Sequence, residues 1–376
     1  MPIKRARIAK AEPFAILLTF YNYVKNNLLL DIGLKIIIPI PNINFLFLYF
    51  LLSLYSTRNG FNLLNSKLYP LVFEPNVKIY ASESSHFSIG TSPYYAHQHA
   101  VGIDIYDQLT LENYEVVSPV SGTVLQIKEM RAPQPKFKEG CDTEYLTVIQ
   151  NSDDKGTVFK ILHVKPALKV DQEIKPGDLL GTTIRNGYFA PWSSPHIHLE
   201  LKKPEDVLRA KKGLHFLLNT EFDVIMNSNE PINYEKIPLK VEYICDEFFL
   251  GRFPDDLYYH IKPFYGLRGT SGNVNFIIDG GIPQYKHGIV HLCNGGDALL
   301  IQPIYFNNIE IGELNGFHGR FGLVSFKKVH MLFNNVPICG ISLFLANYHP
   351  LIKLIPSKKV DFDIPLNTVY NLSVQT

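Results

Sequence analysis

Short runs of apolar, β-branched and aromatic residues, separated by polar and turn residues, follow one another between residues 93 and 203. Residues of these types in runs of this length favour strands. Strands at this spacing, separated by turn residues, are typical of an antiparallel sandwich or barrel. The predicted strands are Gly102–Tyr106, Glu115–Val117, Gly122–Ile127, Glu144–Gln150, Thr157–His163, Leu179–Thr183 and His196–Leu201.

The same kind of pattern returns in the last part of the chain, where Asp279-Gly280-Gly281 follows a strand-like run and signals a turn. Between the two parts, Pro204–Gly213 begins with proline and acids and ends with bases and glycine, which predicts a short helix. We therefore expect a lead-in over residues 61–92, one β domain over residues 93–230 and a second β-rich accessory domain over residues 231–376. The pattern does not indicate what this second domain does.

Residues 1–60 have a different pattern, because Phe45–Tyr55 is apolar at nearly every position and carries no charge. Such a run has no polar face, and the longer uncharged stretch around it can cross a hydrocarbon layer of about 30 Å. Positive charges lie mainly before it, which favours the bulk of the chain outside the cytoplasm. We expect an apolar helical N-terminal segment that serves as a membrane anchor or export signal. A buried helix of a soluble protein is the alternative.

Composition narrows the class of protein. The 376 residues exceed one typical domain, and 21 Tyr with 25 Phe favour mainly β structure. The net charge of +1 argues against a nucleic-acid partner.

The four cysteines lie far apart, so they form no metal-binding doublet and are expected to be free thiols. His287, His291 and Cys293 could share one strand face, but they lack a fourth metal-binding partner.

The candidate chemistry is concentrated in a His-x-His pair. His196 and His198 lie two residues apart in a predicted strand, so both imidazoles point to one face. Upstream, Asp104 lies in a strand-like run that follows two histidines, and His163 interrupts another apolar strand. Two histidines and one aspartate are a ligand set that leaves a fourth zinc position open for water.

Together these motifs resemble the lysostaphin-type (LytM-like) zinc metallopeptidases. Ser118–Val124 is similar to the family's strand–turn–strand after the first ligands, and Ile174–Gly181 is similar to its glycine turn before the last strand. The resemblance covers roughly residues 93–203. It implies a duplicated hybrid motif fold with an antiparallel β-sandwich of hairpins, one Zn²⁺ per chain, and hydrolysis of peptide bonds in a peptide or cell-wall polymer.

The resemblance also implies roles for single residues. Asp104 and His198 match metal ligands, while His163 and His196 match histidines that assist catalysis by orienting the water and transferring protons. The first ligand is open between two histidines, because the family's usual spacing before the aspartate is four residues. His99 lies five residues before Asp104 and His97 lies seven, so we expect His99, the nearer of the two.

Two other functions fit parts of the same pattern. Ser118–Gly122 and Lys175–Asp178 are also similar to hairpins of lipoyl and biotin carrier domains, but the modifiable lysine tip that those domains need is missing ahead of Ser118. A non-catalytic relative that only binds the cell wall or another enzyme is the second alternative. The chain has no His-Glu-x-x-His motif, which argues against the helical zincin mechanism.

Overall fold

The computed structural model describes residues 67–220, 233–272, 274–292, 303–357 and 365–375. The expected N-terminal apolar segment and Cys293 lie outside these ranges. No helix within the described ranges is both long and apolar enough to span a bilayer. We call residues 67–220 the N-terminal half and residues 233–375 the C-terminal half; both belong to one structural unit, Arg58–Thr376.

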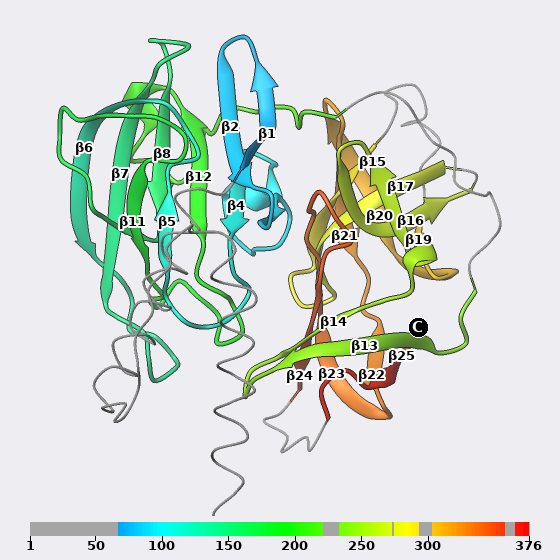
Figure 1. Ribbon diagram of the computed structural model, residues 1–376. Coiled ribbons are helices and arrows are strands. Elements are labelled where there is room, and N and C mark those ends of the chain that lie inside the picture. Colours follow the sequence, from blue (N-terminus) through cyan, green and yellow to red (C-terminus); the bar gives the residue numbers. More distant parts are fainter. Residues whose placement is uncertain (1–66, 221–232, 273, 293–302, 358–364, 376) are drawn as a thin grey trace, which may run out of the picture. The chain divides into compact units, whose positions relative to one another are not determined.

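The N-terminal half is built almost entirely from antiparallel strands, as expected (Figure 1). Its largest sheet has the order β10-β6-β7-β8-β12-β4-β3, beside a three-stranded sheet, β5-β11-β9, and the hairpin β1-β2. The helix predicted over Pro204–Gly213 was wrong in length, since only one 3₁₀ turn forms there, η1 (Pro204–Asp206). The other elements are β1 (Leu68–Glu74), β2 (Val77–Ser82), β3 (His86–Ser88), α3 (Tyr95–Gln98), β4 (Gly102–Tyr106), β5 (Glu115–Val117), β6 (Gly122–Arg131), β7 (Thr143–Asn151), β8 (Val158–Leu162), β9 (Val164–Pro166), β10 (Glu173–Ile174), β11 (Leu179–Thr183) and β12 (Ile197–Lys202).

The C-terminal half is also antiparallel, which confirms the prediction of a second β-rich part. Its strand pairings close two rings of six strands, one formed by β16 to β21 and one by β13, β14 and β22 to β25, and β17 pairs with β23 to join them. The elements are β13 (Ile237–Ile244), β14 (Phe249–Arg252), η2 (Asp255–Leu257), β15 (Tyr258–Ile261), β16 (Phe264–Ser271), β17 (Val274–Ile282), β18 (His287–His291), β19 (Ile304–Phe306), β20 (Ile309–His318), β21 (Phe321–Phe326), β22 (His330–Phe333), β23 (Val336–Ser342), β24 (Ile352–Pro356) and β25 (Val369–Gln375).

The turn predicted at Asp279-Gly280-Gly281 was wrong, because these residues lie inside β17. Gly280 has a φ of +156°, and a Cβ at this position would lie only 3.0 Å from the Cα of Gly288 in the paired strand β18. Without a Cβ at this position the two strands can approach, so the glycines serve strand packing here rather than chain reversal.

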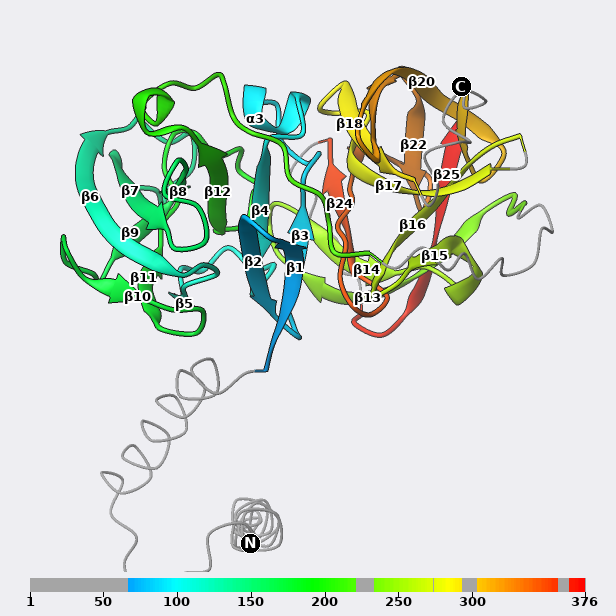
Figure 2. The same cartoon turned by 90° about the horizontal axis from the view of Figure 1, so that it is seen from above.

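The two halves share one hydrophobic core. Phe87 of β3 and Phe264 of β16 are both fully buried, and their ring centroids lie 4.9 Å apart. The backbones also pair, since Phe87 and Leu345 each donate an N–H to the other's carbonyl at 2.8 Å. The helix α3 lies next to β18 (Figure 2). Elements of the C-terminal half therefore pack directly behind the segment that leads into β4.

Replacing Phe264 with alanine is expected to destabilise the protein by about 3–5 kcal/mol, because it removes a buried ring and leaves a cavity in the shared core. Chemical denaturation followed by circular dichroism measures the change. Phe73→Ala is the matched control, since this ring is 56% exposed, and we expect less than about 1 kcal/mol for it. Two separate transitions, of which only one shifts in Phe264→Ala, would contradict a core shared by both halves.

Candidate metal centre

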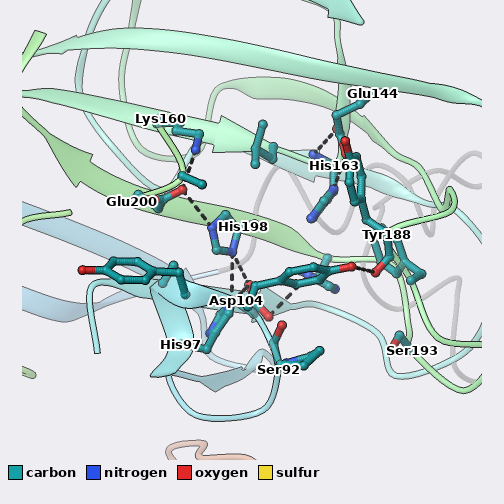
Figure 3. A pocket seen from close by; sticks show the side chains of 18 of the residues that line it. Ser92, His97, Asp104, Glu144, Lys160, His163, Tyr188, Ser193, His198 and Glu200 are labelled. Atoms are coloured by element: carbon teal, nitrogen blue, oxygen red, sulfur yellow. Dashed lines mark hydrogen bonds and ion pairs between the residues drawn. The ribbon is translucent and has the colours of Figure 1, made fainter. Parts of the chain in front are cut away.

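Three buried side chains from separate elements meet beneath a cavity: His97 of α3, Asp104 of β4 and His198 of β12 (Figure 3). The Nε2 of His97 lies 3.3 Å from Asp104 Oδ1 and 3.2 Å from His198 Nδ1. The His198 Nδ1 lies 2.7 Å from the same carboxylate oxygen. Within the described residues, this is the group of His, Cys, Asp and Glu side chains that comes close enough to hold a metal ion.

Strand register explains how two of the three residues meet. In the antiparallel pair of β12 and β4, His198 lies directly opposite Asp104. Side chains directly opposite each other in such a pair have Cβ atoms about 5 Å apart on the same face. The neighbouring Gly102 makes room for the imidazole, because a Cβ there would lie 3.1 Å from His198 Cε1 and 2.9 Å from the Ala96 Cβ.

The structure brings His97, and not His99, to Asp104 and His198. His97 lies inside the helical turn α3 and His99 is its C-cap residue, and residues two apart in a helix point about 200° apart. The His99 ring instead stacks on Tyr95 at 3.9 Å, and its Nδ1 donates to the Tyr95 carbonyl at 3.0 Å. The expectation from sequence spacing, which favoured His99, is therefore corrected: His97 is the candidate first ligand.

Hydrogen bonds orient the two imidazoles of this group. His97 Nδ1 donates to the Ile89 carbonyl at 2.8 Å, which leaves the Nε2 lone pair for a metal ion. The Nε2 of His198 lies 3.4 Å from Glu200 Oε1, so its Nδ1 is the nitrogen turned toward Asp104. Lys160 and Lys202 contact Glu200 at 2.7 and 2.9 Å and balance its buried charge.

His163 and His196 lie beside the three candidate ligands, with their ring centroids 5.2 Å apart. His196 Nδ1 donates to the Ser194 carbonyl at 2.8 Å, and its Nε2 lies 3.4 Å from Asp104 Oδ2. The His163 ring centroid lies 5.9 Å from that of His198. The structure thus gathers in one place every histidine that the sequence singled out for the site, except His99.

Glu144 holds His163 in place and was not singled out from the sequence. Its carboxylate accepts hydrogen bonds from the His163 backbone N–H at 2.8 Å, from His163 Nδ1 at 2.6 Å and from Asn186 Nδ2 at 2.9 Å. His163 has a φ of +67°, a conformation that non-glycine residues seldom adopt. Burial alone would raise the pKa of Glu144, but the charge of His163 and these hydrogen bonds lower it to about 2.

No motif marks Glu144, because it lies 19 residues before its partner. Glu200, in contrast, carried a signal that could have been used. It follows His198 by two residues, so both side chains point to the same face of one strand.

The charges of the group are strongly coupled. Burial alone would raise the pKa of Asp104, but the imidazoles of His196 and His97 and the hydrogen bond from His198 lower it well below its usual range. Burial lowers the pKa of His196 to about 3, although Asp104 opposes this. Burial also acts to lower the pKa of His198, but the hydrogen bonds to Asp104 and Glu200 outweigh it and raise the pKa to about 9. A neutral His196 beside an ionised Asp104 keeps its Nε2 lone pair available.

The donor set fits a zinc ion. Zinc is bound by imidazole nitrogen and carboxylate oxygen at about 2.0–2.2 Å, and catalytic sites with three such ligands leave a fourth position open. A tetrahedral ion with bonds of this length has ligand atoms about 3.3 Å apart. Two of the three separations in this group are 3.2 and 3.3 Å, and the third is the His198–Asp104 hydrogen bond, which an ion would replace.

The cavity above the group has a volume of about 540 Å³ and gives a substrate access to these residues. Glu144, His163 and His196 line it together with apolar side chains. Tyr285, from the turn between β17 and β18 of the C-terminal half, also lines it. The apolar lining residues include Met130, Leu146, Leu162, Phe189 and Leu208.

Each half of the chain matches one of two related family models. Residues 76–218 match the model described as domain of unknown function (DUF8155) N-terminal domain, and residues 256–366 match the model of the DUF8155 C-terminal domain. No curated protein that was compared matches the chain by sequence.

Solved structures with partial similarity include lysostaphin-type peptidases. A complex of SpoIIIAH and SpoIIQ contains a chain with 16% identity, a TM-score of 0.25, and coverage of 38% of this chain and 96% of that chain. A protein from Ruminococcus gnavus that is described as a glycyl-glycine endopeptidase LytM has 23% identity, a TM-score of 0.18, and coverage of 31% of this chain and 41% of that chain. Lysostaphin has 13% identity, a TM-score of 0.21, and coverage of 60% and 86%.

Proposed function

We propose that the protein is a zinc-dependent endopeptidase that hydrolyses peptide bonds in a peptide or cell-wall polymer. One observation supports this most strongly: His97, Asp104 and His198 lie together in the geometry of an open three-ligand site. Two further histidines lie beside them, and all five side chains line one cavity. The arrangement combines a candidate Lewis-acid site with groups that can move protons, as amide hydrolysis requires.

Each side chain has a distinct task in this proposal. A zinc ion held by His97 Nε2, Asp104 and His198 Nδ1 would polarise a peptide carbonyl and acidify a water molecule. His196 and His163 both have Nδ1 held by a hydrogen bond, to Ser194 and Glu144 respectively, so each turns Nε2 toward the cavity. These nitrogens would accept the proton of the attacking water, stabilise the developing oxyanion and protonate the departing amine.

The cavity supports a statement about the substrate as well. Its apolar lining residues, which include Met130, Leu146 and Leu162, favour a peptide with an apolar side chain near the scissile bond. A wall or matrix polymer lies outside the cytoplasm. We therefore propose an extracytoplasmic location, with residues 1–60 as the anchor or export signal, on the basis of their apolar sequence alone.

Incubating the purified protein with Zn²⁺ and a mixed peptide library tests the proposal. We expect cleavage at defined positions, detected by mass spectrometry, and its loss after treatment with a chelator and return on adding zinc. Purified cell-wall material serves as a second substrate. Binding of peptide or wall without any cleavage, at full zinc occupancy, would instead favour the non-catalytic alternative.

A further inference from the structure

A buried carboxylate of the C-terminal half holds the loop that precedes α3. Asp279 in β17 is fully buried, and its carboxylate accepts hydrogen bonds from four groups, one in the last residue of β3 and three in that loop. These are Ser88 Oγ at 2.5 Å, the backbone N–H of Ile89 at 2.6 Å and of Gly90 at 3.2 Å, and Thr91 Oγ1 at 3.4 Å. His291 Nε2 lies 3.2 Å from the same carboxylate on the other side.

This loop sets the orientation of a candidate ligand. The carbonyl of Ile89, whose N–H is bound by Asp279, accepts the hydrogen bond from His97 Nδ1. Gly90 allows the close approach, because a Cβ there would lie 2.3 Å from the Asp279 carbonyl oxygen. Asp279 is thus connected to the His97 ring through one residue.

A buried lysine of the C-terminal half holds the loop that precedes β12 in the same manner. Lys353 in β24 is 2% exposed, and its Nζ donates to the Trp192 carbonyl at 2.9 Å and to Ser194 Oγ at 2.6 Å. The carbonyl of Ser194 accepts the hydrogen bond from His196 Nδ1. Lys353 is thus connected to the His196 ring through one residue, just as Asp279 is connected to His97.

The turn between β17 and β18 and the first residue of β18 each add one contact to the same loops. Tyr285 accepts a hydrogen bond from Trp192 Nε1 at 3.1 Å, and His287 Nε2 donates to the Ser92 carbonyl at 2.7 Å.

Burying charged groups in a core costs free energy that apolar side chains of similar size would avoid. The burial of these two ionisable side chains, Asp279 and Lys353, therefore calls for an explanation other than the stability of the core.

We propose that the C-terminal half completes the active site, with Asp279 and Lys353 as positioning residues for His97 and His196 respectively. The proposal rests on the proposed function for the separate roles of these two histidines, ligand and proton-transfer group. The two positioning residues should then affect different measurable quantities. Asp279 should govern zinc affinity, because it acts on a ligand, and Lys353 should govern turnover.

Three variants of the full chain test this split: Asp279→Asn, Lys353→Met and, as control, Arg268→Gln. Arg268 is a charged residue of β16 whose Nε donates to Asn275 Oδ1 at 2.8 Å. We expect Asp279→Asn to weaken zinc binding about 10- to 100-fold, as measured by competition with a chelating dye. We expect Lys353→Met to keep its zinc affinity within about twofold and to lower kcat about 10-fold or more at unchanged KM. The control should change neither.

Zinc-free protein provides a readout that does not depend on the proposed function. In the wild type, ring-nitrogen NMR should show His97 and His196 each with the proton on Nδ1. Asp279→Asn should alter only His97 and speed amide exchange at Ile89 about 10-fold or more, and Lys353→Met should alter only His196. Gly90→Ala, which displaces the loop without changing a charge, should reproduce the Asp279→Asn pattern.

The outcomes separate the two proposals. Wild-type protein that binds no zinc and cleaves no peptide would overturn the proposed function, whereas the NMR measurements would still decide whether the C-terminal half positions the histidines. Unchanged ring states and exchange rates in both variants would overturn the positioning roles. So would an equal loss of zinc affinity and turnover in both variants together with a lower Tm, because that pattern reports general destabilisation.

Discussion

Alanine in place of His97 is expected to abolish zinc binding at micromolar concentrations, whereas alanine in place of His99 leaves it unchanged. His97 Nε2 lies within 3.3 Å of both other candidate ligands, while the His99 ring stacks on Tyr95 outside the group. Loss of a direct ligand should cost more than the roughly 10- to 100-fold that loss of a supporting partner costs. Metal content after dialysis and isothermal titration calorimetry measure the effect.

This pair is a matched control in itself, because both substitutions remove one imidazole from the same short segment. Asp104→Ala and His198→Ala should behave like His97→Ala, with one zinc per chain lost in each. Equal metal content in the wild type and all four variants would contradict the metal centre. Loss of zinc in His99→Ala but not in His97→Ala would restore the ligand that the sequence spacing favoured.

Alanine in place of His163 or His196 is expected to leave zinc binding nearly intact and to lower peptide cleavage by about 10²–10⁴-fold. Both rings lie beside the candidate ligands with one nitrogen held by a neighbour and the other turned to the cavity. This is the arrangement of a general acid or base, whose removal typically has an effect of that size. The measurement is kcat/KM for the best peptide from the library, alongside zinc content.

His330→Ala serves as the control for these two variants, because this histidine lies exposed on β22 of the C-terminal half. It should retain full activity and full zinc content. If His163→Ala or His196→Ala loses zinc in parallel with activity, that histidine is a ligand instead of a proton-transfer group. If cleavage persists at the wild-type rate, it has no part in catalysis.

Several interpretations of the sequence that depend only on local pattern agree with the structure, and one does not. Gly102–Tyr106, Glu115–Val117 and Leu179–Thr183 form strands with the predicted bounds. The His196-Ile197-His198 pair does present both imidazoles to one face, because side chains two apart in extended backbone share a face. The predicted turn at Asp279 failed, because a local Asp-Gly signal cannot show that a strand from elsewhere will pair there.

The runs of β-type residues along the chain by themselves determined that the protein is mainly β, and the His-x-His pair with Asp104 determined what chemistry to look for. Only the tertiary structure decided that His97 rather than His99 joins the group and that Glu144 and Glu200 support it. It also decided that Asp279 and Lys353 of the C-terminal half contact the loops behind His97 and His196. The physical reason is how far apart along the chain the interacting residues lie. The tendency to form a strand is set by neighbours along the chain. The register of the paired strands, the orientation of the helical turn that contains His97 and hydrogen bonds across 159 to 191 residues exist only once the chain has folded.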